Sequence, residues 1–86
     1  MPVSGVVIVC RSGCAPAVSQ RIAAEEGVEV HGVPDDATII AVIEAESVHD
    51  EVQIVKRLAE TDGVQDVRLA YHNFEDVSAV ETEAEP

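Results

Sequence analysis

Positive charge and aromatic rings are both scarce in this sequence. Its 86 residues include five lysines and arginines against seventeen aspartates and glutamates, so the formal net charge at pH 7 is −12. There is no tryptophan, one tyrosine and one phenylalanine. Proteins that read nucleic acids normally offer a cationic surface and rings that stack on bases, so this composition argues against nucleic acid as a partner. It favours a cationic partner, with solubility alone as the plain alternative.

Long apolar runs and cysteines are also few. No stretch approaches the ~20 apolar residues of a membrane span, and Met1–Ser4 lacks the cationic start and cleavage site of a secretory signal. We therefore expect a cytoplasmic protein with no stable membrane insertion. Two cysteines, Cys10 and Cys14, are too few for a disulfide framework, and we expect both thiols to be reduced.

Hydrophobic periodicity divides the chain into four strands and two helices. The expected strands are Val3–Cys10, Val28–His31, Ala37–Ala45 and Val64–His72. The first helix is expected over Ala15–Glu26, ended by Gly27, and a turn over Pro34–Asp36. The second helix begins after an N-cap at Ser47 and ends before Asp62-Gly63.

Each helix carries an apolar stripe at helical spacing, which we expect to face the sheet. The stripe of the first helix is Ala15, Val18 and Ile22. That of the second helix is Val48, Val52, Val55, Leu58 and Ala59.

The element order β-α-β-β-α-β predicts an α+β, ferredoxin-like split βαββαβ fold. Both helices then cover one face of a four-stranded antiparallel sheet whose first and third strands are central. We expect one domain over residues 1–74. Residues 75–86 carry five acids and little to bury, which is typical of a disordered acidic tail.

Strand periodicity assigns side chains to the two sheet faces, and Glu44 sets the parity of its strand because a carboxylate belongs outside. The residues expected under the helices are Val6, Ile8, Cys10, Val28, Val30, Ile39, Ala41, Ile43, Val67, Leu69 and Tyr71. The open face is then an apolar stripe with a largely acidic rim. The apolar members are Val7, Val9, Ile40, Val42 and Ala70, and the polar ones are Glu29, His31, Glu44, Asp66, Arg68 and His72.

An exposed apolar stripe with a polar rim usually marks an interaction surface. Covering it would remove roughly 300 Å² of apolar surface from water, worth about 7 kcal/mol before the cost of ordering a ligand. Homodimerisation through this face is the alternative interpretation, so we expect a monomer or a weak dimer.

Residues that could carry chemistry form no convincing catalytic group. Cys10 and Cys14 lie where small copper-handling domains of this fold hold metal, but an inward Cys10 would prevent both sulfurs from converging on one ion. The three histidines lack ligand spacing, and a flat sheet offers no concave site for a carboxylate pair. We expect no enzyme activity, no metal and no cofactor.

Several segments resemble the NapD-type chaperone family. Gly63–Glu75, which contains Tyr71-His72 followed by acids, resembles the closing strand of that family. Val3–Val9, Gly27–His31 and Ile39–Ala45 are similar to its first three strands. Gly5 and Ala70 stand where the family commonly has serine and valine.

The resemblance implies a cytoplasmic chaperone that binds the twin-arginine signal peptide of the catalytic subunit of periplasmic nitrate reductase. Such a chaperone restrains export until the molybdenum cofactor is inserted. A peptide helix laid on the sheet fits best, and strand addition beside Val28–His31 or Val64–His72 is the other mode. The candidate peptide-binding residues are Val7, Val9, Ile40, Val42, Glu44, Arg68, Ala70, His72, His31 and Glu29.

Two other functions remain open at this point. An ACT-like small-molecule sensor shares the topology and would use the loop at Ser12-Gly13 in a subunit interface. A metal-handling domain would use Cys10 and Cys14.

Overall fold

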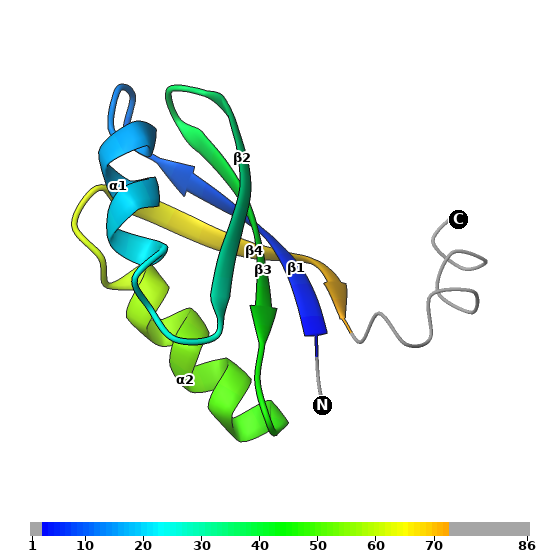
Figure 1. Ribbon diagram of the computed structural model, residues 1–86. Helices are drawn as coiled ribbons and strands as arrows, with labels where there is room; N and C mark the ends of the chain where they lie inside the picture. Colours follow the sequence, from blue (N-terminus) through cyan, green and yellow to red (C-terminus); the bar gives the residue numbers. More distant parts are fainter. Residues whose placement is uncertain (1–2, 73–86) are drawn as a thin grey trace.

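A computed structural model describes residues 3–72 of the chain, as one sheet with two helices packed on it (Figure 1). The strands are β1 (Val3–Cys10), β2 (Val28–Asp35), β3 (Thr38–Glu44) and β4 (Val64–His72). The helices are α1 (Ala15–Ile22) and α2 (Val48–Ala59). The predicted acidic tail, residues 75–86, lies outside the described residues.

The four strands form one antiparallel sheet in the order β2-β3-β1-β4. Both helices lie on the same side of this sheet, and no other element among residues 3–72 covers the opposite side (Figure 1). The element order, the sheet and the central position of β1 and β3 confirm the predicted ferredoxin-like fold.

The core forms where the covered face of the two central strands meets the helices. The predicted parity of β1 and β3 is confirmed, because the inward residues of both strands are almost fully buried. Those residues are Val6, Ile8, Cys10, Ile39, Ala41 and Ile43. Ala15, Val18 and Ile22 of α1 pack on them as the sequence predicted, together with Ile54 and Leu58 of α2.

Helix α1 ends at Ile22 and not at Glu26 as predicted. Ile22 is its last buried residue. The chain then continues in tighter turns, in which the N–H of Ala24 donates to the carbonyl of Arg21, three residues earlier, at 3.2 Å. Gly27, with φ of +87°, directs the chain into β2. A Cβ at Gly27 would lie 2.7 Å from the backbone oxygen of Glu44, so glycine lets these two segments approach closely.

Strand β2 is longer than predicted and runs through Pro34 to Asp35. A proline is tolerated there because β2 is an edge strand, with one side free of sheet hydrogen bonds. The turn to β3 is therefore at Asp36–Ala37, where Ala37 N–H donates to Oδ1 of Asp35 at 2.9 Å.

Helix α2 begins as predicted, because the Ser47 side chain accepts a hydrogen bond from the backbone N–H of Asp50 at 3.1 Å. Its buried face was predicted wrongly in part. Val48 and Val52 are 56% and 48% exposed, whereas the buried residues are Glu51, Ile54 and Leu58. The helix is thus rotated about its axis relative to the predicted stripe.

A buried hydrogen bond explains this rotation. Ser4 of β1 is fully buried and its hydroxyl donates to Oε2 of Glu51, which is 3% exposed. A buried carboxylate requires polar partners, so the carboxylate and the serine must meet inside the layer between α2 and the sheet. That contact turns Val48 and Val52 away from the core.

Strand β4 has the predicted bounds but an interrupted register. Val6 pairs with Leu69 and Gly5 pairs with Tyr71, so Ala70 is one residue more than β1 can pair. The extra residue reverses the alternation at the end of the strand. Tyr71 therefore occupies a register position of the open face and His72, opposite Ser4, one of the covered face, which corrects the predicted parity of both residues.

Ser4→Ala should lower the free energy of unfolding by about 1–3 kcal/mol, because it removes a hydrogen bond to a buried carboxylate. Urea denaturation followed by circular dichroism measures the change. The matched control is Ser12→Ala in the exposed loop after β1, which should shift the value by less than about 0.5 kcal/mol. Equal effects of the two substitutions would show that the Ser4–Glu51 contact does not stabilise the fold.

Candidate functional site

The candidate site is the apolar centre of the uncovered sheet face. We call Val7, Val9, Ile40 and Val42 the open-face stripe. Val7 lies opposite Ile40 in the register, and Val42 lies opposite Gly5. Ile40 is 38% exposed, and the other three side chains are half-buried by their neighbours. The structure therefore brings the four predicted aliphatic residues together on one face.

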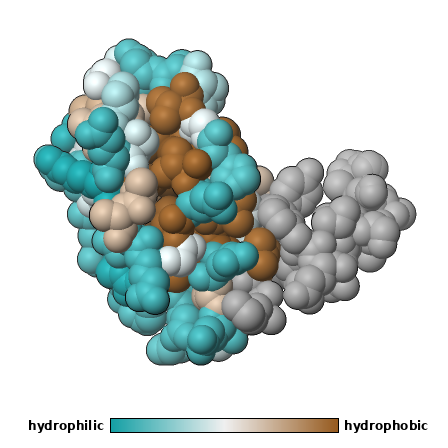
Figure 2. Space-filling view, in the orientation of Figure 1, coloured by the Kyte–Doolittle hydropathy of each residue, from teal (hydrophilic) through white to brown (hydrophobic). Residues whose placement is uncertain are grey.

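Hydrophobic residues also gather visibly at the molecular surface. In the orientation of Figure 1, they form a band along β2 and across the neighbouring strands, with hydrophilic residues on both sides (Figure 2). An apolar band bordered by polar residues is the pattern of an interaction surface.

Charged residues border the stripe on both edge strands. On β2, Glu29 lies opposite Val42 in the register, and its Oε1 is 3.7 Å from Nε2 of His31. On β4, Arg68 lies opposite Val7 and Asp66 opposite Val9. Arg68 Nε donates to Oδ2 of Asp66 at 2.9 Å, so these two side chains form an exposed ion pair along that border.

The remaining predicted residues lie toward one end of the stripe, where β1 begins. Glu44 is exposed at the end of β3, opposite Val3. Ala70 is exposed at the register shift of β4. His72 does not follow the predicted alternation, because the extra residue at Ala70 places it opposite Ser4.

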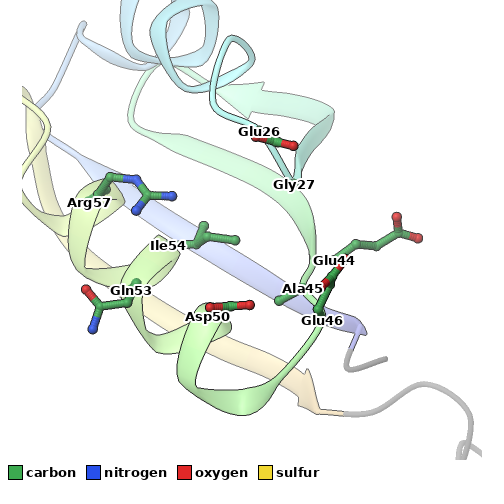
Figure 3. Close-up of a pocket in the computed structure, with 9 residues that line it drawn as sticks. All are labelled: Glu26, Gly27, Glu44, Ala45, Glu46, Asp50, Gln53, Ile54 and Arg57. Atoms are coloured by element: carbon green, nitrogen blue, oxygen red, sulfur yellow. The ribbon is translucent and has the colours of Figure 1, made fainter.

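An open cavity of about 280 Å³ lies near Glu44, at the end of β3 (Figure 3). Its lining residues are Glu26, Gly27, Glu44, Ala45, Glu46, Asp50, Gln53, Ile54 and Arg57. Figure 3 shows Ile54 at the centre of the group, whereas the Glu44 side chain extends away from Ile54 and Arg57. Glu44 therefore belongs both to the cavity wall and to the open face of the sheet.

Of the residues that line this cavity, Glu44 is the one that the sequence predicted as a site residue. The other acids of the lining come from two segments: Glu26 precedes β2, and Glu46 and Asp50 lie around the start of α2. Pairing of Val28 with Ile43 brings these segments together, and Glu44 N–H donates to the carbonyl of Gly27 at 2.8 Å. The sequence predicted that β2 and β3 are neighbouring antiparallel strands. The register of this hairpin could therefore have indicated that the acids of the cavity lie together.

Most carboxylates at the cavity have no cationic side chain beside them. Arg57 contributes a positive charge, and its Nε lies 3.2 Å from Oε1 of Glu25. Among residues 3–72, no ion pair within 4.0 Å reaches Glu26, Glu44, Glu46 or Asp50. The end of β3 therefore gathers four exposed carboxylates that form no ion pair with a cation among residues 3–72.

The two thiols lie at the junction of β1 and α1. Cys10 is buried and Cys14 half-buried, and both are free. Burial raises the pKa of the Cys10 thiol, and the neighbouring Cys14 raises it further. Cys10 thus packs as a small apolar side chain in the core, as its inward position in β1 predicted.

The part of the chain that the structure describes, residues 3–72, contains no membrane-spanning helix and no metal-binding cluster. Neither helix is both long and apolar enough to cross a membrane. No group of three or more histidine, cysteine, aspartate or glutamate side chains in that range is arranged to hold a metal ion.

Comparison with known proteins gives a match to one described family and matches to solved structures. The family described as NapD protein matches residues 1–76. The solution structure of the E. coli Tat proofreading chaperone protein NapD is similar to this chain with a TM-score of 0.73 and 30% sequence identity. That likeness covers 86% of this chain and 79% of the E. coli chain. No curated protein matches the chain.

The pKa of the Asp66 carboxyl should lie below its ordinary value, because the Arg68 side chain and then the backbone N–H of Val67 donate hydrogen bonds to it. Arg68→Gln should raise that pKa towards the ordinary value. Arg21→Gln, at an exposed position of α1, should leave the pKa of Asp66 unchanged. NMR titration of the Asp66 carboxyl carbon measures each midpoint. An unmoved midpoint in Arg68→Gln would contradict the ion pair.

Proposed function

The chain belongs to the NapD family, and on that premise we propose that it is a cytoplasmic, non-enzymatic proofreading chaperone of twin-arginine export. Its ligand is the signal peptide of the catalytic subunit of periplasmic nitrate reductase. The observation that carries the proposal is the open-face stripe, an uncovered apolar surface with acids along its border and at one end.

The chemistry of the ligand matches this surface in both of its parts. A twin-arginine signal joins a cationic segment to an apolar one. The open-face stripe offers aliphatic contact for the apolar segment, and Glu29 and Glu44 offer carboxylates for the cationic segment. With a net charge of −12, the whole molecule also attracts a cationic peptide at long range.

The dimensions of the sheet favour a helical peptide. From the level of Val9 to that of Val3, β1 rises about 20 Å at roughly 3.3 Å per residue. A helix of about 13 residues has the same length. An apolar peptide segment of that size can therefore lie along the stripe and cover it.

Holding the signal in this way would restrain export by occupancy. A peptide whose apolar face is packed on the sheet cannot present that face to the export machinery at the same time. Release then requires that the chaperone dissociate, and the folding of the catalytic subunit and insertion of its molybdenum cofactor proceed while the signal is covered. The chaperone itself needs no catalytic group or cofactor for this role.

Calorimetry with the synthetic signal peptide should give a dissociation constant of micromolar or tighter. Changing both peptide arginines to glutamine should weaken binding, because the acids at the border then lose their partners. The titration should be repeated at high salt, which screens these exposed charges. No heat of binding at high peptide concentration would overturn the proposed function.

Val42→Asp should weaken peptide binding at least tenfold, because it places a carboxylate in the middle of the apolar contact. The matched control is Val52→Asp, the same change at an exposed valine of α2 on the other layer. Circular dichroism and urea denaturation should show both variants folded. Equal binding by the two variants would place the peptide elsewhere than on the open-face stripe.

A further inference from the structure

We propose that the peptide lies on the open-face stripe in one direction, with its paired arginines at the Glu44 end and the far end of its apolar segment at the Val9 end. This inference rests on the proposed function and adds an orientation to it. It follows from how the carboxylates are distributed along the strands, because the aliphatic stripe by itself would accept either direction.

Carboxylates at the Glu44 end are available to a ligand. Glu44 and Glu46 are exposed where β3 leaves the sheet, and Glu26 and Asp50 line the adjoining cavity. Arg57, the cation that lines this cavity, already pairs with Glu25 at 3.2 Å. A guanidinium that arrives beyond the end of the stripe therefore meets several carboxylates that have no cationic partner among residues 3–72.

Carboxylates at the Val9 end are largely engaged. Asp66 accepts from Arg68 at 2.9 Å, and Asp62 lies 3.4 Å from Arg11. The Asp35 carboxylate accepts a hydrogen bond from the backbone N–H of Ala37. This hydrogen bond, followed by those from Thr38, lowers the pKa of Asp35. Asp36 is an exposed acid beside Asp35 that none of these contacts uses.

The described cations at this end reduce its attraction for a cationic ligand. Arg11 follows β1 directly and pairs with Asp62, and Arg68 lies beside Val7 on the border of the stripe and pairs with Asp66. Two peptide arginines placed there would compete with these cations for the same carboxylates, whereas at the Glu44 end they would not. The preferred direction is therefore set by the difference in available carboxylates between the two ends.

Spin-labelled peptides test the direction on the full-length protein. One synthetic peptide carries a nitroxide next to the paired arginines and a second carries it at the other end of the apolar segment. The label is attached through a thioether, so that it cannot exchange with Cys14. Broadening of the protein amide NMR signals is compared before and after chemical reduction of the nitroxide.

We expect the label beside the arginines to broaden Glu44, Ala45 and Glu46, and the distal label to broaden Val9, Thr38 and Asp66. The reverse pattern, or equal broadening of both groups by each label, would overturn the orientation while leaving binding intact. A peptide that does not bind at all would instead remove the proposed function, and the orientation with it.

Charge removal at each end gives a second readout. The double variant Glu44→Gln and Glu46→Gln should weaken peptide binding about three- to tenfold and reduce its salt dependence. Asp36→Asn, at the Val9 end, should change the dissociation constant by less than about twofold. A larger effect of Asp36→Asn than of the double variant would contradict the orientation.

Discussion

The hydrogen bond from Ser4 to Glu51 joins β1 to α2 inside the covered layer, and the arrangement of α2 follows from it. A carboxylate in that layer is stable only beside polar partners. Meeting this requirement turns Val48 and Val52 outward and points Ile54 and Leu58 into the core. It also directs the opposite flank of the helix, with Asp50, Gln53 and Arg57, toward the end of β3, where these side chains wall the acidic cavity. One polar contact thus affects both the core and the charged end of the sheet.

The parts of the fold that could be predicted from the sequence are those in which residue type and periodicity agree. Glu44 identifies the outward face of β3, and antiparallel pairing then sets which residues of β1 share that face. Ser47, followed by Asp50, marks the start of α2 because a serine hydroxyl can accept from that backbone amide. The four aliphatic members of the candidate site depend only on these local rules, and for that reason they could be found before the structure.

The remaining features depend on contacts between distant segments. Aliphatic residues occur on two sides of α2, so spacing alone favoured Val48 and Val52. The side that packs on the sheet carries Glu51, whose partner Ser4 belongs to a distant strand. The extra residue at Ala70 changes the pairing of Tyr71, and nothing in a run of alternating residues indicates it. The cavity requires Gly27 to approach the backbone of Glu44, which is a property of the assembled hairpin.

The register shifts also affect whether the sheets of two molecules can pair edge to edge. Both outer strands are interrupted, β2 on either side of Gly32 and β4 at two places in its pairing with β1. An outer strand with broken register and charged side chains is a poor template for another strand, so sheets of neighbouring molecules do not readily extend one another. Mutual repulsion at a net charge of −12 acts in the same direction. Both features therefore act against edge-to-edge association of molecules that carry an exposed apolar stripe on the sheet.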